Sequence, residues 1–469
     1  MDLHKLTIKQ AKDALKKKEV TAEQLTKACL NRIQALEPKL NAFVTTLGEE
    51  AISEAKKADQ KIAEGVDLPL LGIPVAIKDN FCTQDIRTTA SSKVLDNFIP
   101  PYDATVVVRL KEAGVVILGK TNMDAWAHGS STETSDYGLT KNPWDINYLP
   151  GGSSGGSAAS IAADETIGAI GSETAGSIRQ PAAWCGVVGL KPTYGRVSRY
   201  GVIAMGSSLD CPGPIAKTVE DSAIMLQVLA GKDLFDATTS PKTVEDYTKS
   251  LSNNIEGLTI GVSDDYFTGV EDEVKQKVED VLKEFEKLGV KIKKIKLFDP
   301  KYAIAVYTIL QRAEVSSNLA RYDGIRFGND RSYFGEEAKR RIMLGTYVLS
   351  AGYYDQYYSK AQKVRTVIVE DFNRAFKEVD VIVGPTSPSV ALPLGSSKNH
   401  PMFGEMADVL VEPSTIAGLP GISIPCGFTK NGLPVGLQVI GPQFSESLIL
   451  NVAYKYEQAT NWHKEKPEL

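Results

Sequence analysis

The chain has 469 residues, of which 42% are hydrophobic and 24% are charged, and its net charge is −5 at pH 7. This composition, without any low-complexity tract, is that of an ordinary globular protein with a sizeable core. The acidic balance and the lack of a basic block argue against a protein whose main task is to grip nucleic acid.

Five scattered cysteines, none of them in a C-x-x-C pair, argue against a disulfide scaffold and against a structural zinc site. They favour a reducing compartment. The N-terminal residues lack the apolar core of a signal peptide, and no apolar run approaches the ~20 residues of a membrane span. We therefore expect a cytoplasmic protein that does not contact membranes.

Residues 5–65 are predicted to be helical. Thr21 and Gln24 have the spacing of a capping box. Four apolar residues follow at helical spacing and predict a buried face: Leu25, Cys29, Ile33 and Leu36. A second helix is predicted over residues 48–63.

The apolar stretch 70–77 is predicted to be a buried strand, and it ends at Lys78. Lysine is rarely buried without a partner or a chemical task. Two interpretations are open at this point. Lys78 either reaches the surface along its aliphatic stem or stays buried with a role in catalysis.

A helix is predicted at 104–113 and a strand at 115–118. This region matches the pattern of a nucleotide-binding P-loop, Gly114-x4-Gly119-Lys120-Thr121. A P-loop needs its four middle residues in a loop whose N–H groups surround a phosphate. Here those residues are Val, Val, Ile and Leu, which form the strand, so no phosphate site is predicted.

The stretch 150–177, PGGSSGGSAASIAADETIGAIGSETAGS, contains two Gly/Ser turns, at 151–157 and 173–177. A run of small residues at 158–163 between them predicts a tightly packed helix. Glycine lets backbone N–H groups approach a ligand, and serine supplies a hydroxyl that can attack or relay a proton. We expect both turns to contribute to one site.

The remaining chain alternates predicted helices and strands. Segments 186–193 and 198–214, rich in Gly, Ser and Pro, are predicted to be loops that shape a wall of the site. The lysine-rich run 291–296 is interpreted as the solvated face of a strand. Helices are predicted at 218–230, 274–288, most of 301–375 and 446–460. Strands are predicted at 258–262, 290–297, 379–383, 421–425 and 435–440.

Strands interleaved with helices throughout predict an α/β protein whose sheet is covered by helices on both faces. The unit 258–297 is long enough for a crossover between parallel strands. No linker separates independent domains, so we predict a single domain over 1–469. Its parts are an N-terminal helical layer (1–65), a catalytic core segment (66–235) and the remainder of the sheet with substrate-specificity helices (236–469).

Two residues are candidates for a catalytic base. Of the four histidines, His128 alone lies in a suitable setting, beside Gly129-Ser130-Ser131. Lys78 is the alternative, provided that burial lowers its pKa of ~10.4 by roughly three units. A serine paired with either base is a competent nucleophile. Backbone N–H groups of the second turn can form an oxyanion hole: those of Thr174, Ala175, Gly176 and Ser177.

Lys78, the GGSSGGS loop at 151–157 and the GSETAGSIRQPA segment at 171–182 together resemble the amidase signature family. The resemblance implies that family's large mixed sheet and its Ser-cisSer-Lys triad. It implies Ser177 as the nucleophile, Ser153 as a relay that follows a cis peptide bond, and Lys78 as the general base.

Longer segments, among them 118–124, 314–328, 339–366, 417–427 and 432–442, are similar to the glutaminase subunits of the tRNA-dependent amidotransferases within this family. The resemblance implies that the chain hydrolyses glutamine and passes ammonia to a partner. The B and C subunits would complete a heterotrimer, in which the partner binds the charged tRNA and uses ATP and Mg²⁺. No cofactor is expected in this chain, which agrees with the absence of a phosphate loop.

Glutamine carries a carboxylate and an ammonium group at its α-carbon, so a glutaminase needs a cation and an anion. The resemblance implies Arg341, with Arg340 as the alternative, for the carboxylate and Asp408 for the ammonium group. It places Ser130 and Thr174 beside the substrate as well. Several neighbours differ from the family pattern: Trp126, Ala127, His128, Glu173, Ala175, Glu412, Ser414 and Thr415.

Two rival functions remain. One is a stand-alone amidase that acts on a small neutral or aromatic amide, and the other is a silent scaffold that only holds its partners. The intact set of Lys78, Ser153 and Ser177 counts against the scaffold. The choice between Glu-tRNA(Gln) and Asp-tRNA(Asn) is expected to lie on the partner.

Overall fold

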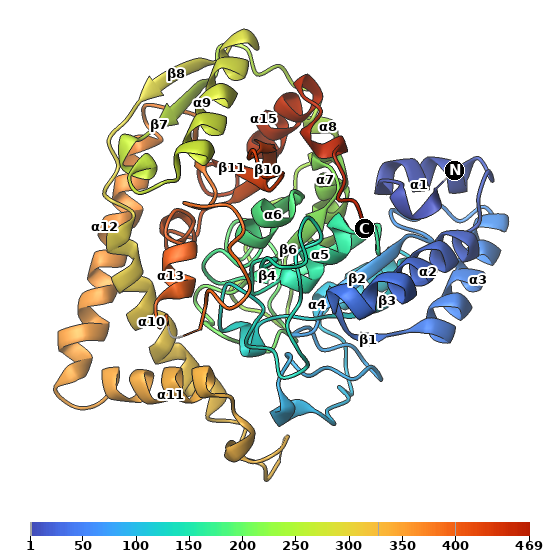
Figure 1. Ribbon diagram of the computed structural model, residues 1–469, viewed down its shortest axis with the longest axis horizontal. Helices are drawn as coiled ribbons and strands as arrows, with labels where there is room; N and C mark the ends of the chain where they lie inside the picture. The colour runs from blue at the N-terminus through green and yellow to red at the C-terminus, as the bar shows by residue number, and fades with distance from the viewer. Residues whose placement is uncertain (1, 327, 399) are drawn as a thin grey trace.

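A computed structural model describes residues 2–326, 328–398 and 400–469. Within these residues, one 11-stranded sheet runs through the whole molecule (Figure 1). In the order of the sheet, its strands are β1 (Phe43–Thr46), β3 (Val116–Thr121), β2 (Pro74–Lys78), β4 (Gly168–Glu173), β6 (Cys211–Ala216), β5 (Val188–Lys191), β10 (Gly421–Phe428), β11 (Pro434–Ile440), β9 (Val381–Pro385), β7 (Thr259–Val262) and β8 (Lys291–Lys294).

The sheet is mixed, as predicted. Strand β2 is parallel to β3 and β4, and β7 is parallel to β8 and β9, whereas the other neighbours are antiparallel. The helices are α1 (Ile8–Lys16), α2 (Ala22–Leu40), α3 (Gly48–Ala63), α4 (Thr105–Glu112), α5 (Gly155–Ala162), α6 (Arg179–Cys185), α7 (Val219–Leu229), α8 (Tyr247–Ser250), α9 (Asp272–Lys287), α10 (Lys301–Leu319), α11 (Glu336–Val348), α12 (Lys360–Ala375), α13 (Phe403–Ala407), α14 (Glu412–Ile416) and α15 (Glu446–Ala459).

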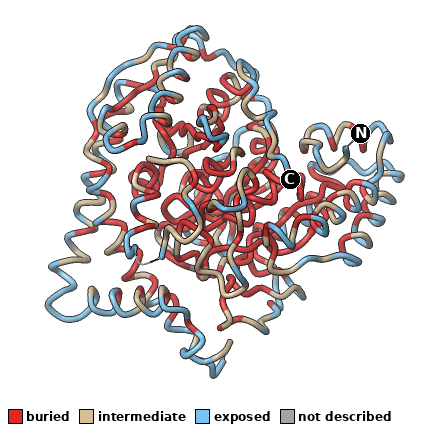
Figure 2. The backbone as a smooth tube through the Cα atoms, viewed as in Figure 1, coloured by how far each residue is buried: buried red, intermediate tan, exposed pale blue. Residues whose placement is uncertain are grey.

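Helices pack on both faces of this sheet, which confirms the predicted class. Along β4, Gly168 faces Met225 of α7, while Gly171, three residues further on, faces Ile178 just before α6. Since side chains alternate along a strand, α6 and α7 cover opposite faces. Figure 2 shows the buried centre that results and the exposed surface of α11 at the edge of the molecule.

The N-terminal helices are largely as predicted. Thr21 and Gln24 form the capping box that precedes α2, with both reciprocal hydrogen bonds present. Helix α3 spans the predicted residues. Residues 43–46, however, form strand β1, which pairs with β3 at the edge of the sheet. A strand of this length between two helices has too few residues for a recognisable alternation.

The predicted loops at 186–193 and 198–214 are partly wrong, because 188–191 and 211–216 are the interior strands β5 and β6. Their glycines allow the chain around Ile178 to pack directly on the sheet. A Cβ atom on Gly189 would lie 2.8 Å from the Ile178 carbonyl oxygen, and one on Gly213 would lie 2.2 Å from that of Leu190. Glycine in a strand here marks close backbone packing and not a turn.

The C-terminal half follows the predicted pattern closely. The unit β7-α9-β8 joins parallel strands, and the lysines of β8 are exposed, as expected for a solvated strand. Helices α10, α11 and α12 account for most of 301–375. None of the described helices combines the length and the apolar character that a bilayer crossing requires.

Candidate active site

Lys78 is the last residue of β2 and has no exposed surface, so the interpretation that it reaches solvent is wrong. Its Nζ atom lies 2.8 Å from Ser153 Oγ and 3.1 Å from the carbonyl oxygen of Ser172. It forms no ion pair with any described residue. Burial lowers the pKa of Lys78 to about 7, against the opposing effect of Asp124 and other buried carboxylates. Lys78 can therefore be neutral near physiological pH.

Ser153 lies in the first Gly/Ser turn and follows a cis peptide bond from Gly152. Gly152 donates its N–H to Gln180 Oε1 at 2.9 Å, and it has no room for a side chain, because a Cβ atom would lie 2.1 Å from Asp124 Oδ2. The two turns meet where Ser154 N–H donates to the Ser177 carbonyl at 3.2 Å. The structure thus brings both turns into one site, as the sequence predicted.

In the second turn, three carbonyl groups are hydrogen-bonded to other described residues, whereas the N–H groups are not. The carbonyls of Ala175, Gly176 and Ser177 accept hydrogen bonds from Thr415 Oγ1, Gln180 N–H and Ser154 N–H respectively. The N–H groups of residues 174–177 donate no hydrogen bond to another described residue. The Ser177 side chain likewise makes none, and 4% of the residue is exposed. This arrangement leaves a hydroxyl and adjacent donors available to a ligand.

Thr174 is held by a carboxylate that the sequence did not reveal. Its hydroxyl donates to Asp210 Oδ1 at 2.6 Å. Asp210 is in turn fixed by the N–H groups of Met205 and Gly206. Burial raises the pKa of Asp210 to about 6. A buried aspartate directly before β6 is the signal that could have pointed to it.

Ser130 and Asp408 are 278 residues apart in the chain and are in direct contact. Ser130 Oγ donates to Asp408 Oδ2 at 2.8 Å. The other oxygen, Oδ1, is buried and has no hydrogen-bond partner among the described residues. It lies against the second turn, since a Cβ atom on Gly176 would be 2.4 Å from it. Burial raises the pKa of Asp408 well above its usual range.

Of the two candidate arginines on α11, Arg341 is buried and Arg340 is partly exposed. Arg341 Nε donates to Glu337 Oε1 at 2.5 Å, while Nη1 is buried without a partner among the described residues. Arg340 pairs with Glu337 and reaches the carbonyl of Pro401. Arg341 is thus the residue with a free donor inside the protein.

Arg341 and Asp408 are both buried side chains. The pKa of Tyr307 lies well above its usual value because of burial, and the charges of both residues act on it. For Arg341, burial lowers the pKa, but Glu337 and other neighbours bring it above its usual value, so the guanidinium stays charged. Among the described residues, Arg341 thus supplies a fixed cation with a free Nη1, and Asp408 supplies a carboxyl with a free Oδ1.

His128 is buried, and neither ring nitrogen has a hydrogen-bond partner among the described residues. Burial, followed by the charges of Arg341 and Arg312, lowers the pKa of His128 well below 6.5. A general base needs hydrogen-bond reach of its nucleophile. Lys78 Nζ lies within hydrogen-bond reach of a serine hydroxyl, that of Ser153, whereas His128 has no hydrogen-bond partner among the described residues.

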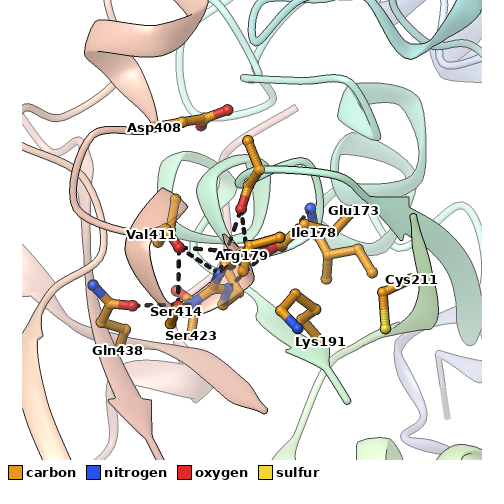
Figure 3. Close-up of polar contacts among 12 residues, drawn as sticks. Glu173, Ile178, Arg179, Lys191, Cys211, Asp408, Val411, Ser414, Ser423 and Gln438 are labelled. Atoms are coloured by element: carbon orange, nitrogen blue, oxygen red, sulfur yellow. Dashed lines mark hydrogen bonds and ion pairs between the residues drawn. The ribbon is translucent and has the colours of Figure 1, made fainter. Parts of the chain in front are cut away.

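Arg179 and Glu173 form a buried ion pair that the sequence did not single out. Arg179 Nη2 lies 2.6 Å from Glu173 Oε1, and neither residue has exposed surface. Figure 3 shows Arg179 between Glu173 on one side and Val411 and Ser414 on the other. The signal in the sequence is one arginine within a buried run of mostly small or apolar residues, 174–185.

Comparisons with known proteins identify the family and similar proteins. The protein family described as Amidase matches residues 24–450. The A subunit of the glutamyl-tRNA(Gln) amidotransferase of Caldanaerobacter subterraneus is 54% identical over 98% of this chain and 97% of its own length. That of Thermoanaerobacter pseudethanolicus is 53% identical over 100% and 99%.

Solved structures agree in fold. The A subunit of the glutamyl-tRNA(Gln) amidotransferase of Thermotoga maritima has a TM-score of 0.82 and 43% identity, with 97% of this chain and 94% of that chain covered. The peptide amidase of Stenotrophomonas maltophilia has a TM-score of 0.84 and 32% identity, with 97% of each chain covered.

Proposed function

The chain belongs to the amidase family, and on this premise we propose that it is the glutaminase subunit of a tRNA-dependent amidotransferase. It hydrolyses the side-chain amide of glutamine and supplies the ammonia for amidation of a charged tRNA. The contact of 2.8 Å between Lys78 Nζ and Ser153 Oγ, next to a turn with free N–H groups, is the observation that supports this chemistry best.

The reaction proceeds through an ester on Ser177. The hydroxyl of Ser177 attacks the amide carbon, and its proton passes through Ser153 to neutral Lys78. The N–H groups of residues 174–177 bind the negative oxygen of the tetrahedral intermediate, a contribution of about 3–4 kcal/mol per donor. Protonated Lys78 then returns the proton through Ser153 to the leaving nitrogen, which departs as ammonia. Water, deprotonated by the same relay, cleaves the glutamyl ester and releases glutamate.

Asp408, together with Ser130, binds the α-ammonium group of glutamine, and Arg341 binds its α-carboxylate. The free Oδ1 of Asp408 and the free Nη1 of Arg341 support these roles. Asp408 is buried, so its carboxyl becomes an effective anion when the ammonium of the substrate arrives and compensates the cost of desolvation. Thr174, held by Asp210, borders the same turn.

The remaining steps belong to other chains. A partner, the B subunit, binds Glu-tRNA(Gln) or Asp-tRNA(Asn), activates it with ATP and Mg²⁺ and accepts the ammonia, and a small C subunit completes the heterotrimer. The names of the relatives support this assembly. The complex works in protein synthesis in the cytoplasm, and the five buried free cysteines support such a reducing compartment.

The test is to purify the complex from its native source and to measure glutamate release and glutamine-dependent amidation of each charged tRNA. Ser177→Ala should abolish both, and His128→Ala should keep the relay intact. Hydroxylamine should trap the ester as a glutamyl hydroxamate. Retained activity in Ser177→Ala would refute the nucleophile.

A stand-alone amidase is the second candidate, and it is favoured by the close fold of the peptide amidase. Arg341→Ala and Asp408→Ala distinguish the two. If glutamine is the substrate, both changes should impair glutamine hydrolysis and spare a simple amide. If simple amides are hydrolysed and glutamine is not, the stand-alone function is correct.

A further inference from the structure

The second turn, residues 174–177, is hydrogen-bonded to helix α14 through the Ala175 carbonyl. Thr415 of α14 is almost fully buried, with 2% exposure. Its Oγ1 atom lies 2.7 Å from the carbonyl oxygen of Ala175 and 3.1 Å from Glu173 Oε1. Arg179 Nη2 approaches the same atom at 2.9 Å. The hydroxyl thus sits among three groups that border the turn.

The direction of the Thr415 hydroxyl proton follows from its neighbours. A hydroxyl has a single proton and accepts with its lone pairs. The guanidinium of Arg179 has only donors, so Thr415 Oγ1 accepts there. Arg179 also satisfies Glu173 Oε1 through Nε and Nη2. The proton of Thr415 therefore goes to Ala175, whose carbonyl is the nearest acceptor.

This hydrogen bond is the shorter of two that hold the Ala175–Gly176 peptide, since Arg179 Nη2 also donates to the Ala175 carbonyl, at 3.4 Å. A trans peptide is planar, and its C=O and N–H groups point in opposite directions. When Thr415 holds the Ala175 carbonyl toward α14, the N–H of Gly176 must point the other way. The Gly176 N–H donates to no described residue, so on that side it is available to a ligand.

Asp408, which is proposed to bind the α-ammonium group of glutamine, lies just before helix α14 in the chain. The carbonyl of Asp408 accepts hydrogen bonds from the N–H groups of Val411 and Glu412. The carbonyl of Val411 accepts from Arg179 Nη2 at 3.0 Å. A Cβ atom on Gly176 would lie 2.6 Å from Val411 Cγ2, so the turn and this segment are in contact (Figure 3).

We propose that Thr415 is a positioning residue for the oxyanion site: its hydroxyl, through the Ala175 carbonyl, aims the Gly176 N–H at the reacting oxygen. It does not touch the substrate. The proposal rests on the proposed function, in which Ser177 is the nucleophile and residues 174–177 bind the developing negative charge.

The test compares three variants in the assembled complex. Thr415→Val keeps the shape and removes the hydroxyl, Thr415→Ser keeps the hydroxyl, and Ser414→Ala is the matched control. Ser414 also bonds Arg179, at 2.9 Å, but does not contact the turn. Thr415→Val should lower kcat for glutamine by about 10-fold or more with KM within about twofold, as expected when a transition-state donor is misaligned. Thr415→Ser should restore most of kcat, and Ser414→Ala should change it by less than about twofold.

A second readout separates this inference from the glutaminase function. A fluorophosphonate that labels Ser177 needs the oxyanion site and no glutamine. Labelling of Thr415→Val, and of Thr415→Ala if the valine variant folds poorly, should be slower than wild type at equal melting temperature. Labelling at the wild-type rate, or an equal loss in Ser414→Ala, would overturn the inference. No labelling of Ser177 in the wild type would instead overturn the proposed nucleophile.

Discussion

Two neighbouring strand ends carry buried lysines that differ only in their partners. Strands β2 and β3 run parallel, and Lys78 ends one of them while Lys120 is the penultimate residue of the other. Neither side chain has exposed surface. Lys120 Nζ lies 3.6 Å from Asp79 Oδ1 and donates to the Phe81 carbonyl and to Thr88 Oγ1. Lys78 has a hydroxyl and a carbonyl beside it and no paired carboxylate.

The presence or absence of a carboxylate partner distinguishes a structural lysine from a candidate base. Burial lowers the pKa of both, but the adjacent Asp79 opposes this effect at Lys120. At Lys78, burial lowers the pKa to about 7. A carboxylate in contact favours the ammonium form, so a buried lysine without such a partner is the better candidate for a general base. Lys120, the lysine of the P-loop-like pattern, therefore has protein groups as partners where a P-loop lysine would bind phosphate.

The largest effect is expected from Lys78→Met. It removes the base and should lower glutamine hydrolysis by at least about 1,000-fold. The melting temperature should not fall, because no buried carboxylate loses its partner. Lys78→Arg, whose guanidinium cannot accept a proton, should be equally inactive. A glutamate-release assay measures the activity, and thermal unfolding of the same complexes measures the melting temperature. Substantial activity in either variant would show that Lys78 is not the base.

Lys120→Met should have the opposite signature. It leaves Asp79 buried and unpaired, which costs about 3–5 kcal/mol in the free energy of unfolding. The fraction that stays folded at low temperature should keep its activity, since Lys120 contacts no residue of the triad. The double variant Lys120→Met with Asp79→Asn should recover part of the lost stability in denaturant titrations. A variant that is fully stable but inactive would assign Lys120 to catalysis instead.

The pH dependence should report Lys78. Its neutral form is the base, and that form is lost as the pH falls through about 7. The value of kcat/KM should therefore decrease about tenfold per pH unit below this point and level off above it. Rate profiles between pH 5 and 9 would show this limb. A profile that is flat down to pH 5 would mean that Lys78 is not the group that titrates.

The smallest effect is expected at an exposed lysine in a strand. Lys294 of β8 pairs with Asp264 at 2.6 Å, and the two side chains are 75% and 77% exposed. Surface pairs contribute little, so Lys294→Met should shift the melting temperature by no more than about 1 °C and leave activity unchanged. A larger shift would show that an ion pair stabilises the protein without burial, and that burial is not the cause of the stability loss expected for Lys120→Met.

Much of the fold could be predicted from periodic patterns, as for α2, α3, β2 and α9. The interior strands β4, β5 and β6 could not. Strand β6, with the sequence Cys-Pro-Gly-Pro-Ile-Ala, has the residues of a turn. Gly213 has no space for a side chain, because a Cβ atom would lie 2.2 Å from the Leu190 carbonyl oxygen and 3.1 Å from Ile178 Cδ1. Local propensity was overridden by tertiary packing, which a pattern in the sequence does not record.

The site shows the same division. Lys78 was recognisable because a charge ends an apolar strand. The individual roles of Ser153 and Ser177 came from the family resemblance and stay predictions, and family membership itself is confirmed. The contact between Ser130 and Asp408 joins residues too distant for any local pattern. Thr415 was noted only as a departure from the family pattern, because its contact with Ala175 joins residues 240 positions apart in the chain.

The last two strands to be synthesised, β10 and β11, lie in the middle of the sheet. Strand β10 lies between β5 and β11, and β11 pairs with β9. A nascent chain therefore holds two half-sheets, β1-β3-β2-β4-β6-β5 and β9-β7-β8, whose inner edges stay unpaired until residue 440 has left the ribosome. Open strand edges invite aggregation, and pairing over such sequence distances is slow. A chain that stops before residue 421 would contain Lys78, Ser153 and Ser177 and still lack the hairpin that joins the two half-sheets.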